Sequence, residues 1–335
     1  MSNSRAPRIL ADVDTGIDDA LALIYLAALH SAGEIELIGV TCSAGNTDAA
    51  QATHNSRWIL NLCGAQDVPV ASAFPAPYGV HLTTTPETHG PSGLGYNDAP
   101  PVVHYESVND PLALWSQPRA RGARLVVTGP LTIFERAISE RPECVRAFES
   151  VTVMGGAVGY PGNTTPYSEW NFWVDPHATS TVFSDEFAIE RRRQQFPSLT
   201  LCPLNITETI TVSDHDISLW HEAGMSPELH RAVNLALKFY FEFHQSVGVG
   251  YLAQIHDLFA VMVAVGSVDH DTERIALCAA DQDTWHTDPD RRGHIYEDRR
   301  GLPVDVVTHA DRDSVMAEFV RAISLTSEDN DGRAS

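Results

Sequence analysis

Cations are scarce in this sequence. Of its 335 residues, 22 are lysine or arginine against 44 aspartate or glutamate, so the formal net charge is −22, and Lys238 is its only lysine. A protein with few cations has little capacity to release counterions from a phosphate backbone, which argues against nucleic-acid binding. The same shortage disfavours an anionic membrane surface as a partner.

Cysteine pairs and long apolar runs are also lacking. The five cysteines, at positions 42, 63, 144, 202 and 278, are odd in number and never spaced C-x-x-C. This argues against a disulfide framework and a cysteine zinc site, and fits a reducing compartment. The early apolar run Ala20–Leu29 is too short to span a bilayer, and the N-terminus lacks the order of a signal peptide. We therefore expect a soluble, cytoplasmic protein.

Short apolar runs alternate with helical patterns along the chain. The alternation predicts an α/β fold with a single open, mostly parallel sheet and helices on both faces. In such sheets ligands bind beyond the carboxyl ends of the strands. The expected strands are Ile9–Val13, Leu37–Thr41, Leu125–Thr128, Val151–Met154 and Leu199–Leu201, and the expected helices between them are Asp18–His30, Ala49–Leu62, Thr132–Ser139 and His177–Phe183.

The rest of the chain suggests one domain. Residues 72–101 are rich in proline and glycine, which is typical of a functional lid or a disordered segment. Two more helices are expected, from about Pro227 to His244 and from near His256 onward. No low-complexity linker divides the chain, so we expect a domain over residues 1–326 and a frayed polar tail over 327–335.

Four aspartates lie within eight residues where the first expected strand gives way to a helix: Asp12, Asp14, Asp18 and Asp19. Helix capping accounts for one or two carboxylates there. Four close like charges oppose one another's ionisation, and a bound cation removes that conflict. We therefore favour metal binding over capping. Oxygen-only ligands indicate a hard ion, calcium or magnesium, and flexible carboxylates joined by a backbone carbonyl favour calcium.

Three further segments carry polar groups that could join this cluster. Taken alone, His256-Asp257 is also explained as a helix start, and the segment from Thr128 to Thr132 as a strand–helix connection. The third segment, which holds Glu169, is also explained as a polar loop with a capped helix. That explanation is weaker for Glu169 and Asn171, because they alternate with large aromatic residues. The three segments are His256-Asp257, Thr128-Gly129-Pro130-Leu131-Thr132, and the loop that holds Asn163, Glu169 and Asn171.

Together these motifs resemble the nucleoside hydrolases of the inosine–uridine-preferring family. The match runs in order from Ile9 to about Val265. It implies the nucleoside hydrolase fold with a Rossmann-like core, a tightly held Ca²⁺ ion, and hydrolysis of the N-glycosidic bond of ribonucleosides to ribose and free base. It also implies purine or pyrimidine salvage and a homodimer or homotetramer. The motifs that carry it are Asp12–Asp19, Ser43-Ala44-Gly45-Asn46, Thr128–Thr132, Met154-Gly155-Gly156, Glu169-Trp170-Asn171 and His256-Asp257.

The resemblance further implies roles for individual residues. Asp14 matches the carboxylate that activates the metal-bound water, and His256 matches the histidine linked to the leaving base. The positions that match metal ligands are Asp14, Asp19, Asp257 and the backbone oxygen of Thr128. Those that match the ribose-binding residues are Asp18, Asn46, Asn163, Glu169 and Asn171. Further candidates for contacts with the base are His89, Tyr240, His244 and Tyr251.

The sequence departs from the usual family pattern at five positions that are not expected ligands. Thr15 replaces a commoner proline, and Ile133 stands where asparagine is usual. The others are Ser92 in the His-Gly loop, Asn205 in the Pro-Leu-x-Val-Thr motif, and Leu258 after His-Asp. These departures bear on substrate range and catalytic rate more than on reaction type.

Two other functions remain open. A phosphatase of the haloacid-dehalogenase type also begins with Asp-x-Asp and would use Asp12 as nucleophile with magnesium. However, Gly16 puts its motif one residue out of register, and the lone lysine lies on an expected helix. A nucleoside- or ribose-binding protein without turnover is the second alternative, and the presence of Asp14 beside the expected ligands argues against it. Purine, pyrimidine and mixed specificity all remain possible.

Overall fold

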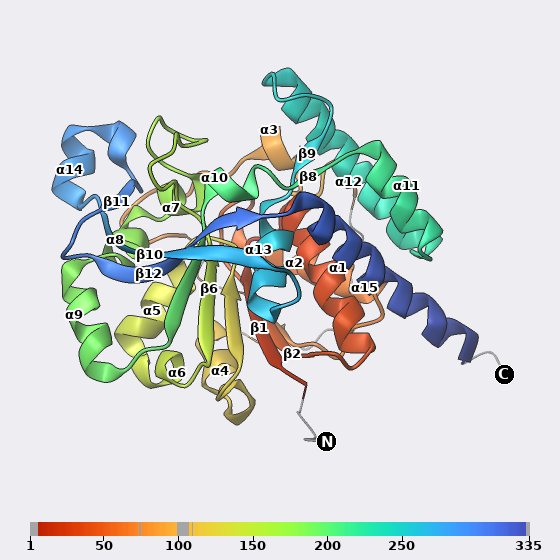
Figure 1. The fold of residues 1–335 in the computed structure, drawn as a ribbon, viewed down its shortest axis with the longest axis horizontal. Helices are drawn as coiled ribbons and strands as arrows, with labels where there is room; N and C mark the ends of the chain where they lie inside the picture. The colour runs from red at the N-terminus through yellow and green to blue at the C-terminus, as the bar shows by residue number, and fades with distance from the viewer. Residues whose placement is uncertain (1–5, 73, 75, 99–106, 109, 333–335) are drawn as a thin grey trace.

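A ten-stranded sheet forms the centre of the molecule (Figure 1). The computed structural model describes residues 6–72, 74, 76–98, 107–108 and 110–332. The strand order is β11-β10-β12-β7-β6-β5-β1-β2-β3-β4. The strands are β1 (Arg8–Val13), β2 (Glu36–Cys42), β3 (Val70–Ser72), β4 (Ser107–Val108), β5 (Arg124–Val127), β6 (Ser150–Met154), β7 (Ser198–Cys202), β10 (His270–Ala279), β11 (Ile295–Glu297) and β12 (Leu302–Ala310). A separate antiparallel pair joins β8 (Thr211–Val212) to β9 (Ala253–Gln254).

The predicted fold class is confirmed. All five expected strands are present, as β1, β2, β5, β6 and β7, and the pairings from β12 through β7 to β4 are parallel. The antiparallel strands β10, β11 and β12 at one edge were not expected. The first half of β10 carries charged residues that are largely exposed, so it lacks the apolar run that identifies a buried strand.

Helices cover both faces of the sheet, and each face has its own apolar core. On one face lie α1 (Ile17–Ser31), α2 (Ala49–Leu62), α13 (His256–Val265) and α15 (Arg312–Gly332), with α11 (Asp214–Glu222) and α12 (Pro227–Ser246) packed against them (Figure 1). On the other face lie α4 (Pro111–Ser116), α5 (Thr132–Glu140), α6 (Pro142–Arg146), α8 (Pro176–Val182) and α9 (Asp185–Gln194). The expected helices correspond to α1, α2, α5, α8, α12 and α13.

Helix α1 is the most deeply buried element near the expected site. Every residue from Ile17 to Leu29 is buried, because α2, α12, α13 and α15 surround it. A helix that is apolar on all sides needs such cover. Two of its buried residues are nevertheless Asp18 and Asp19, both in the first turn. The sequence thus keeps two carboxylates at the N-terminus of a buried helix, which places them at the edge of the sheet.

Most of the expected polar tail over residues 327–335 is helical, and its separation from a domain over residues 1–326 stays a prediction. Helix α15 continues to Gly332, and residues 333–335 lie outside the described part of the chain. Within the long proline- and glycine-rich stretch, α3 (Pro86–His89) is the described helix, whereas residues 73, 75 and 99–101 lie outside the description. Across the residues described, no helix has both the length and the apolar character needed to cross a bilayer.

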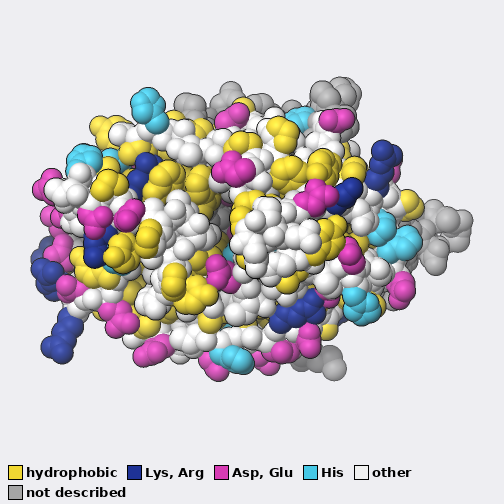
Figure 2. All heavy atoms as spheres, turned by 90° about the horizontal axis from the view of Figure 1, so that it is seen from above, with side chains coloured by type: hydrophobic (Ala, Val, Ile, Leu, Met, Phe, Trp, Pro, Cys, Tyr) yellow, Lys and Arg dark blue, Asp and Glu magenta, His cyan; other side chains and the backbone are white. Residues whose placement is uncertain are grey.

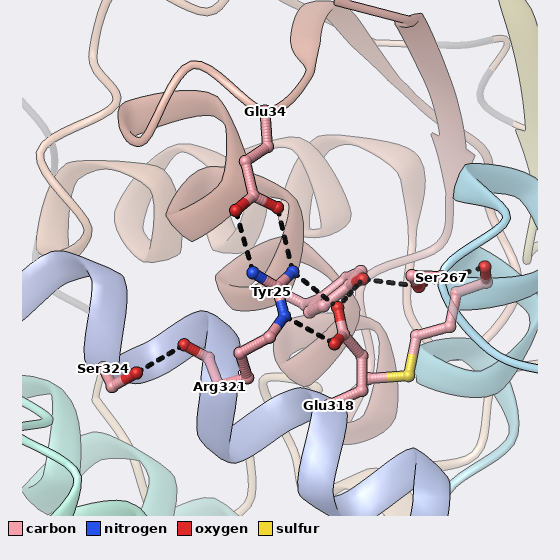
Figure 3. A network of polar contacts seen from close by, with 7 residues as sticks. Tyr25, Glu34, Ser267, Glu318, Arg321 and Ser324 are labelled. Atoms are coloured by element: carbon pink, nitrogen blue, oxygen red, sulfur yellow. Dashed lines mark hydrogen bonds and ion pairs between the residues drawn. The ribbon is translucent and has the colours of Figure 1, made fainter.

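A polar network fastens α15 to α1 (Figure 3). The Tyr25 hydroxyl lies 2.8 Å from Glu318 Oε1, to which it donates, and 2.7 Å from Ser267 Oγ. Arg321 donates to both Glu318 and Glu34, at distances of 2.7 to 2.9 Å. Burial of Tyr25 raises the pKa of its hydroxyl, so it stays a neutral donor at physiological pH. The network ties the C-terminal helix to the helix that carries the aspartates.

We expect Tyr25→Phe to destabilise the protein without changing its ligand site. The substitution leaves the Glu318 carboxylate without its hydroxyl donor, which should lower the free energy of unfolding by about 1–2 kcal/mol. Denaturant unfolding measures the change. Tyr296→Phe is the matched control, because that ring is 39% exposed. Equal unfolding midpoints for Tyr25→Phe and the wild type would contradict the stabilising role.

Candidate active site

The expected site residues gather at the carboxyl edge of the parallel strands. Asp14 follows β1, Asn46 lies in the loop after β2, and Thr128 follows β5. Asp257 comes from the first turn of α13, which packs on β5 and β6. Segments more than a hundred residues apart therefore meet because parallel strands all end at the same edge.

Three carboxylates form the centre of the cluster. Asp18, Asp19 and Asp257 are buried, and each offers an oxygen within 4.8 Å of the others. Burial, followed by the charge of Asp18, raises the pKa of Asp257, which favours a proton on one of the two carboxyl groups when no cation is present. The resemblance had placed Asp14, rather than Asp18, with Asp19 and Asp257 as a ligand. In the structure, Asp14 lies beside this group, and after burial the charge of Asp19 is the next largest cause that raises the pKa of Asp14.

Backbone and side-chain donors orient the cluster. Asp19 caps the start of α1, because its Oδ2 accepts from the backbone N–H of Gly16 at 2.8 Å, while its Oδ1 accepts from Thr128 Oγ1 at 2.8 Å. Asp14 Oδ2 accepts from the backbone N–H of Asn46 at 2.6 Å. Capping thus accounts for one carboxylate. By contrast, Asp14 Oδ1 and Asp18 Oδ1 are buried and have no hydrogen-bond partner among the described residues.

The carboxylates perturb one another's ionisation. Burial, followed by the charge of Asp19, raises the pKa of Asp18 from 3.8 to about 7. Burial is also the largest cause that raises the pKa of Asp14 and Asp257 well above the usual range, and neighbouring aspartates add to it. Without a counter-charge, these groups therefore tend to keep protons. Unpartnered buried oxygens, oxygen-only donors and mutual repulsion fit a hard divalent cation.

A cavity of about 460 Å³ opens next to the carboxylates. Elements that carry lining residues, among them α3, α12 and β9, lie at the top of the molecule in Figure 1, and Figure 2, which views the structure from above, shows a hollow near the middle of this face. The expected residues at its inner end are Asp18, Asn46, Thr128, Glu169, Asn171 and Asp257. Asp14 and Asp19 do not line it, so they lie behind Asp18. None of the described residues that line it is lysine or arginine.

The expected sugar-binding residues are held by the loop after β6 (Ser150–Met154). Glu169 caps α7 (Trp170–Val174), because its carboxylate accepts from the backbone N–H groups of Asn171, Phe172 and Gly156 at 2.8, 3.2 and 2.9 Å. Burial nevertheless raises the pKa of Glu169 to about 7. Asn171 Nδ2 donates to the carbonyl oxygen of Thr128 at 2.6 Å. Capping, which was the weaker explanation for Glu169 in the sequence, is thus present in the structure.

Asn163 and Asn46 both line the cavity. Asn163 is exposed and lines the cavity, and its Oδ1 accepts from the backbone N–H of Trp170 at 3.0 Å. Asn46 is buried, and its Nδ2 donates to Asp19 Oδ2 at 3.3 Å. One atom of each side-chain amide is therefore held by a hydrogen bond within the protein.

Histidine and tyrosine side chains also line the cavity. His256 Nδ1 contacts Thr207 Oγ1 at 2.8 Å, and burial lowers the pKa of His256 to about 3. His89 Nδ1 accepts from the backbone N–H of Ile17 at 3.1 Å, so its neutral ring carries its proton on Nε2. The ring of Tyr240 lies 5.3 Å from His89 and 4.4 Å from His244. All four of these expected base contacts reach the cavity.

Tyr251 is the expected base contact that the structure does not bring to the cavity. Its ring packs on Phe241, with the centroids 5.2 Å apart, and 45% of the residue is exposed. The turn after α12 carries Val247 and Val249 to the cavity mouth and leaves Tyr251 outside. The sequence had suggested Tyr251 as a base contact because it follows the helix before His256, and that contact stays a prediction.

Several cavity residues were missed in the sequence. Glu87 and Thr88 come from α3, Gln254 from β9, and Glu208 ends α10 (Leu204–Thr207). Glu208 follows β7, so the rule that ligands bind beyond the carboxyl ends of strands could have identified it. The other three belong to segments with no strand pattern, and only the tertiary structure brings them to the site.

The five departures from the family pattern lie away from the cavity lining. Thr15 is buried, and its hydroxyl lies 2.6 Å from Ser56 Oγ. Ile133 and Leu258 belong to the apolar cores. Ser92 donates to the carbonyl oxygen of Asn97, and Asn205 lies in α10. These five residues can therefore affect the structure that surrounds the site, but they do not line the cavity themselves.

Comparisons with known proteins agree on one family. The family model described as inosine-uridine preferring nucleoside hydrolase matches residues 9–317. The chain is 32% identical over 253 residues to the pyrimidine-specific ribonucleoside hydrolase RihA of Shewanella sp. (strain ANA-3), covering 74% of each chain. It is 28% identical over 279 residues to the inosine-uridine preferring nucleoside hydrolase of Leishmania major, covering 81% of this chain and 82% of the relative.

Solved structures share the fold. The purine-preferring ribonucleoside hydrolase from Gardnerella vaginalis superposes with a TM-score of 0.82 at 23% identity, covering 96% of this chain and 99% of that one. A plant nucleoside hydrolase gives a TM-score of 0.76 at 21% identity, covering 95% and 99%. The similar proteins include both purine- and pyrimidine-directed enzymes.

We expect calcium to stabilise the protein more at pH 8 than at pH 5. The carboxyl groups have higher pKa values in the folded protein than in the unfolded chain, so the cation-free folded state binds more protons. The contribution of Asp18 to the free energy of unfolding is therefore lost as the pH rises from about 4 to about 7. A cation that replaces those protons reverses the loss. At calcium 100-fold above its Kd, the stabilisation is about 2.7 kcal/mol.

Thermal unfolding with calcium or with chelator, at both pH values, measures this effect. Asp257→Asn should reduce the calcium response, whereas Asp48→Asn, at the exposed N-cap of α2, should preserve it. An equal response to calcium at both pH values would count against cation binding by the raised-pKa carboxylates.

Proposed function

The chain belongs to the inosine–uridine preferring nucleoside hydrolase family and is a ribonucleoside hydrolase, and we propose that it works with Ca²⁺ and with Asp14 as the general base. The observation that carries this proposal is the buried carboxylate cluster at the inner end of the cavity. A clustered set of buried carboxylates without cationic partners is unstable unless protons or a divalent ion balance its charge.

The proposed ligands are Asp14, Asp19, Asp257 and the carbonyl oxygen of Thr128. Asp14 Oδ1 supports this choice because it is buried without a partner, and the Thr128 carbonyl oxygen keeps a second lone pair beside its bond to Asn171. Asp18 satisfies the spacing for a ligand equally well, but it also lines the cavity and can reach a sugar. When bound, the ion would lower the pKa of a coordinated water molecule.

Asp14 is the proposed base. Its Oδ2 is fixed by the backbone N–H of Asn46, and its Oδ1, which would bind the cation through one lone pair, keeps another for the proton of the attacking water. Asp18, Asn46, Glu169 and Asn171 would hold the ribose hydroxyls, and Asn163 would reach the 5′ end from the exposed loop. The surrounding carboxylates also favour the positive charge that the sugar develops as the C–N bond breaks.

His256 is the proposed contact to the leaving base. Thr207 fixes its Nδ1, which directs the other ring nitrogen away from α10. His89 offers an Nε2–H donor from the same wall, and Tyr240 and His244 complete a ring-lined surface against which a planar base can pack. These groups can donate hydrogen bonds to a base that departs with negative charge.

The two alternative functions have less support. A phosphatase needs a cationic anchor for phosphate, and none of the described residues that line the cavity is lysine or arginine. A binding protein without turnover has no need for the unpartnered Asp14 Oδ1 behind the cavity wall. We also propose that the enzyme acts in nucleoside salvage in the cytoplasm as a homodimer or homotetramer.

We expect Asp14→Asn to abolish most turnover and to preserve nucleoside binding. General-base catalysis contributes about 10²–10⁴-fold, so kcat should fall by that factor. A panel of purine and pyrimidine ribonucleosides with reducing-sugar detection measures turnover, and calorimetry measures binding. Asp48→Asn controls for the loss of an acidic group outside the cavity. Full activity in Asp14→Asn would overturn its assignment as the base.

Ribonucleosides should be better substrates than their 2′-deoxy counterparts. A deoxy sugar leaves a buried polar partner of the hydroxyl unsatisfied, at a cost of about 1–3 kcal/mol, which corresponds to roughly 5- to 150-fold in kcat/KM. Competition between inosine and 2′-deoxyinosine, or uridine and 2′-deoxyuridine, measures the preference. Equal kcat/KM values within an accepted pair would show that these residues do not grip the 2′-hydroxyl.

A further inference from the structure

Glu208 is a carboxylate of the cavity wall that neither the cation site nor the sugar site explains. It ends α10, is partly buried and lines the cavity. It follows Thr207, the residue that fixes His256, so it lies beside the wall proposed to face the base. Its location therefore places an anionic acceptor near the part of the substrate that differs between nucleosides.

The Glu208 carboxylate can accept more hydrogen bonds than the described residues donate to it. Its Oε2 accepts from the Tyr160 hydroxyl at 2.9 Å, and among the described residues no other donor to this carboxylate is recorded. An ionised carboxylate offers about four lone-pair positions, so most of them face solvent or a ligand. No described cation lines the cavity to neutralise the charge. The group therefore attracts N–H donors and repels carbonyl oxygens that enter the cavity.

The neighbouring contacts hold Glu208 in place. Gln254 lines the same wall, and its Nε2 donates to the backbone oxygen of Glu208 at 3.4 Å. Tyr160 anchors the carboxylate from the loop after β6, and its own ring is 42% exposed. A fixed acceptor discriminates better than a mobile one, because less conformational freedom is lost when a ligand binds.

We propose that Glu208 determines base specificity and favours bases that carry an exocyclic amino group over those with an oxo group at the same position. This inference rests on the proposed function. Cytidine differs from uridine, and adenosine from inosine, by an amino group in place of an oxo group. The carboxylate accepts a hydrogen bond from the amino group and faces a repulsive lone pair on the oxo group.

Glu208→Gln tests the proposal because glutamine keeps the shape and provides both a donor and an acceptor. We expect the kcat/KM ratios of cytidine to uridine and of adenosine to inosine to be above one in the wild type, wherever both members of a pair are cleaved. In Glu208→Gln each ratio should fall by about tenfold. Reducing-sugar release from each nucleoside, measured under the same conditions, gives the ratios.

Tyr160→Phe is the companion variant that removes the anchor and keeps the carboxylate. The base ratios should then fall less than in Glu208→Gln and stay above one, because the acceptor is more mobile but still present. If both variants slow all four nucleosides by one factor and the ratios stay constant, Glu208 only supports the loop and the proposal is overturned. Unchanged base ratios with new acceptance of 5′-substituted nucleosides would also overturn it, since the carboxylate would then face the sugar.

The two proposals fail in distinguishable ways. If the wild type releases sugar from none of the four nucleosides, the proposed function fails. Calorimetric affinities of the wild type and Glu208→Gln for the same nucleosides still decide the role of Glu208. A cytidine-to-uridine affinity ratio that is the same in both proteins would reject it.

Discussion

Buried negative charge is the constraint on which the rest of this structure depends. Asp14, Asp18, Asp19 and Asp257 share one small volume, and burial is the largest cause of each raised pKa. Such a group can persist only when protons or a cation balance it. The fold fixes where the oxygens point, because they lie on α1, which is buried from Ile17 to Leu29, and next to the ends of β1 and β5. The proposed calcium ion would balance the negative charge of these carboxylates.

The same constraint explains why sequence analysis identified this part of the site well. Four aspartates in eight residues are unusual enough to suggest an ion, and the strand–helix pattern places them at the carboxyl edge. The parallel order of β1, β2, β5, β6 and β7 then brings Thr128 and the loop of Asn171 to the same edge. Regular hydrophobic patterns and an unusual cluster of charges each lie within a short stretch of sequence, so both can be recognised without the tertiary structure.

Features that depend on a turn or an edge were not predictable in the same way. Strand β10 gains its structure from pairing with β12 while its charged first half faces solvent, so its sequence looks like a loop. The turn after α12 sends Val247 to the cavity and Tyr251 away from it, although both lie close to His256 in sequence. Glu169 both caps α7 and lines the cavity, and the sequence alone does not distinguish a capping glutamate from one that lines a cavity.

Charge also connects the proposed chemistry at the two ends of the cavity. At the inner end, carboxylates suit a cation and a sugar that becomes positive as its bond breaks. At the outer end, a base that becomes negative as it leaves requires donors, and the described lining offers histidine, tyrosine and amide groups rather than lysine or arginine. A positively charged residue there would be drawn toward Asp18 and Asp257 and would compete with the metal ion. Neutral donors avoid that competition, and a single carboxylate such as Glu208 can then distinguish one base edge from another without a cation to mask it.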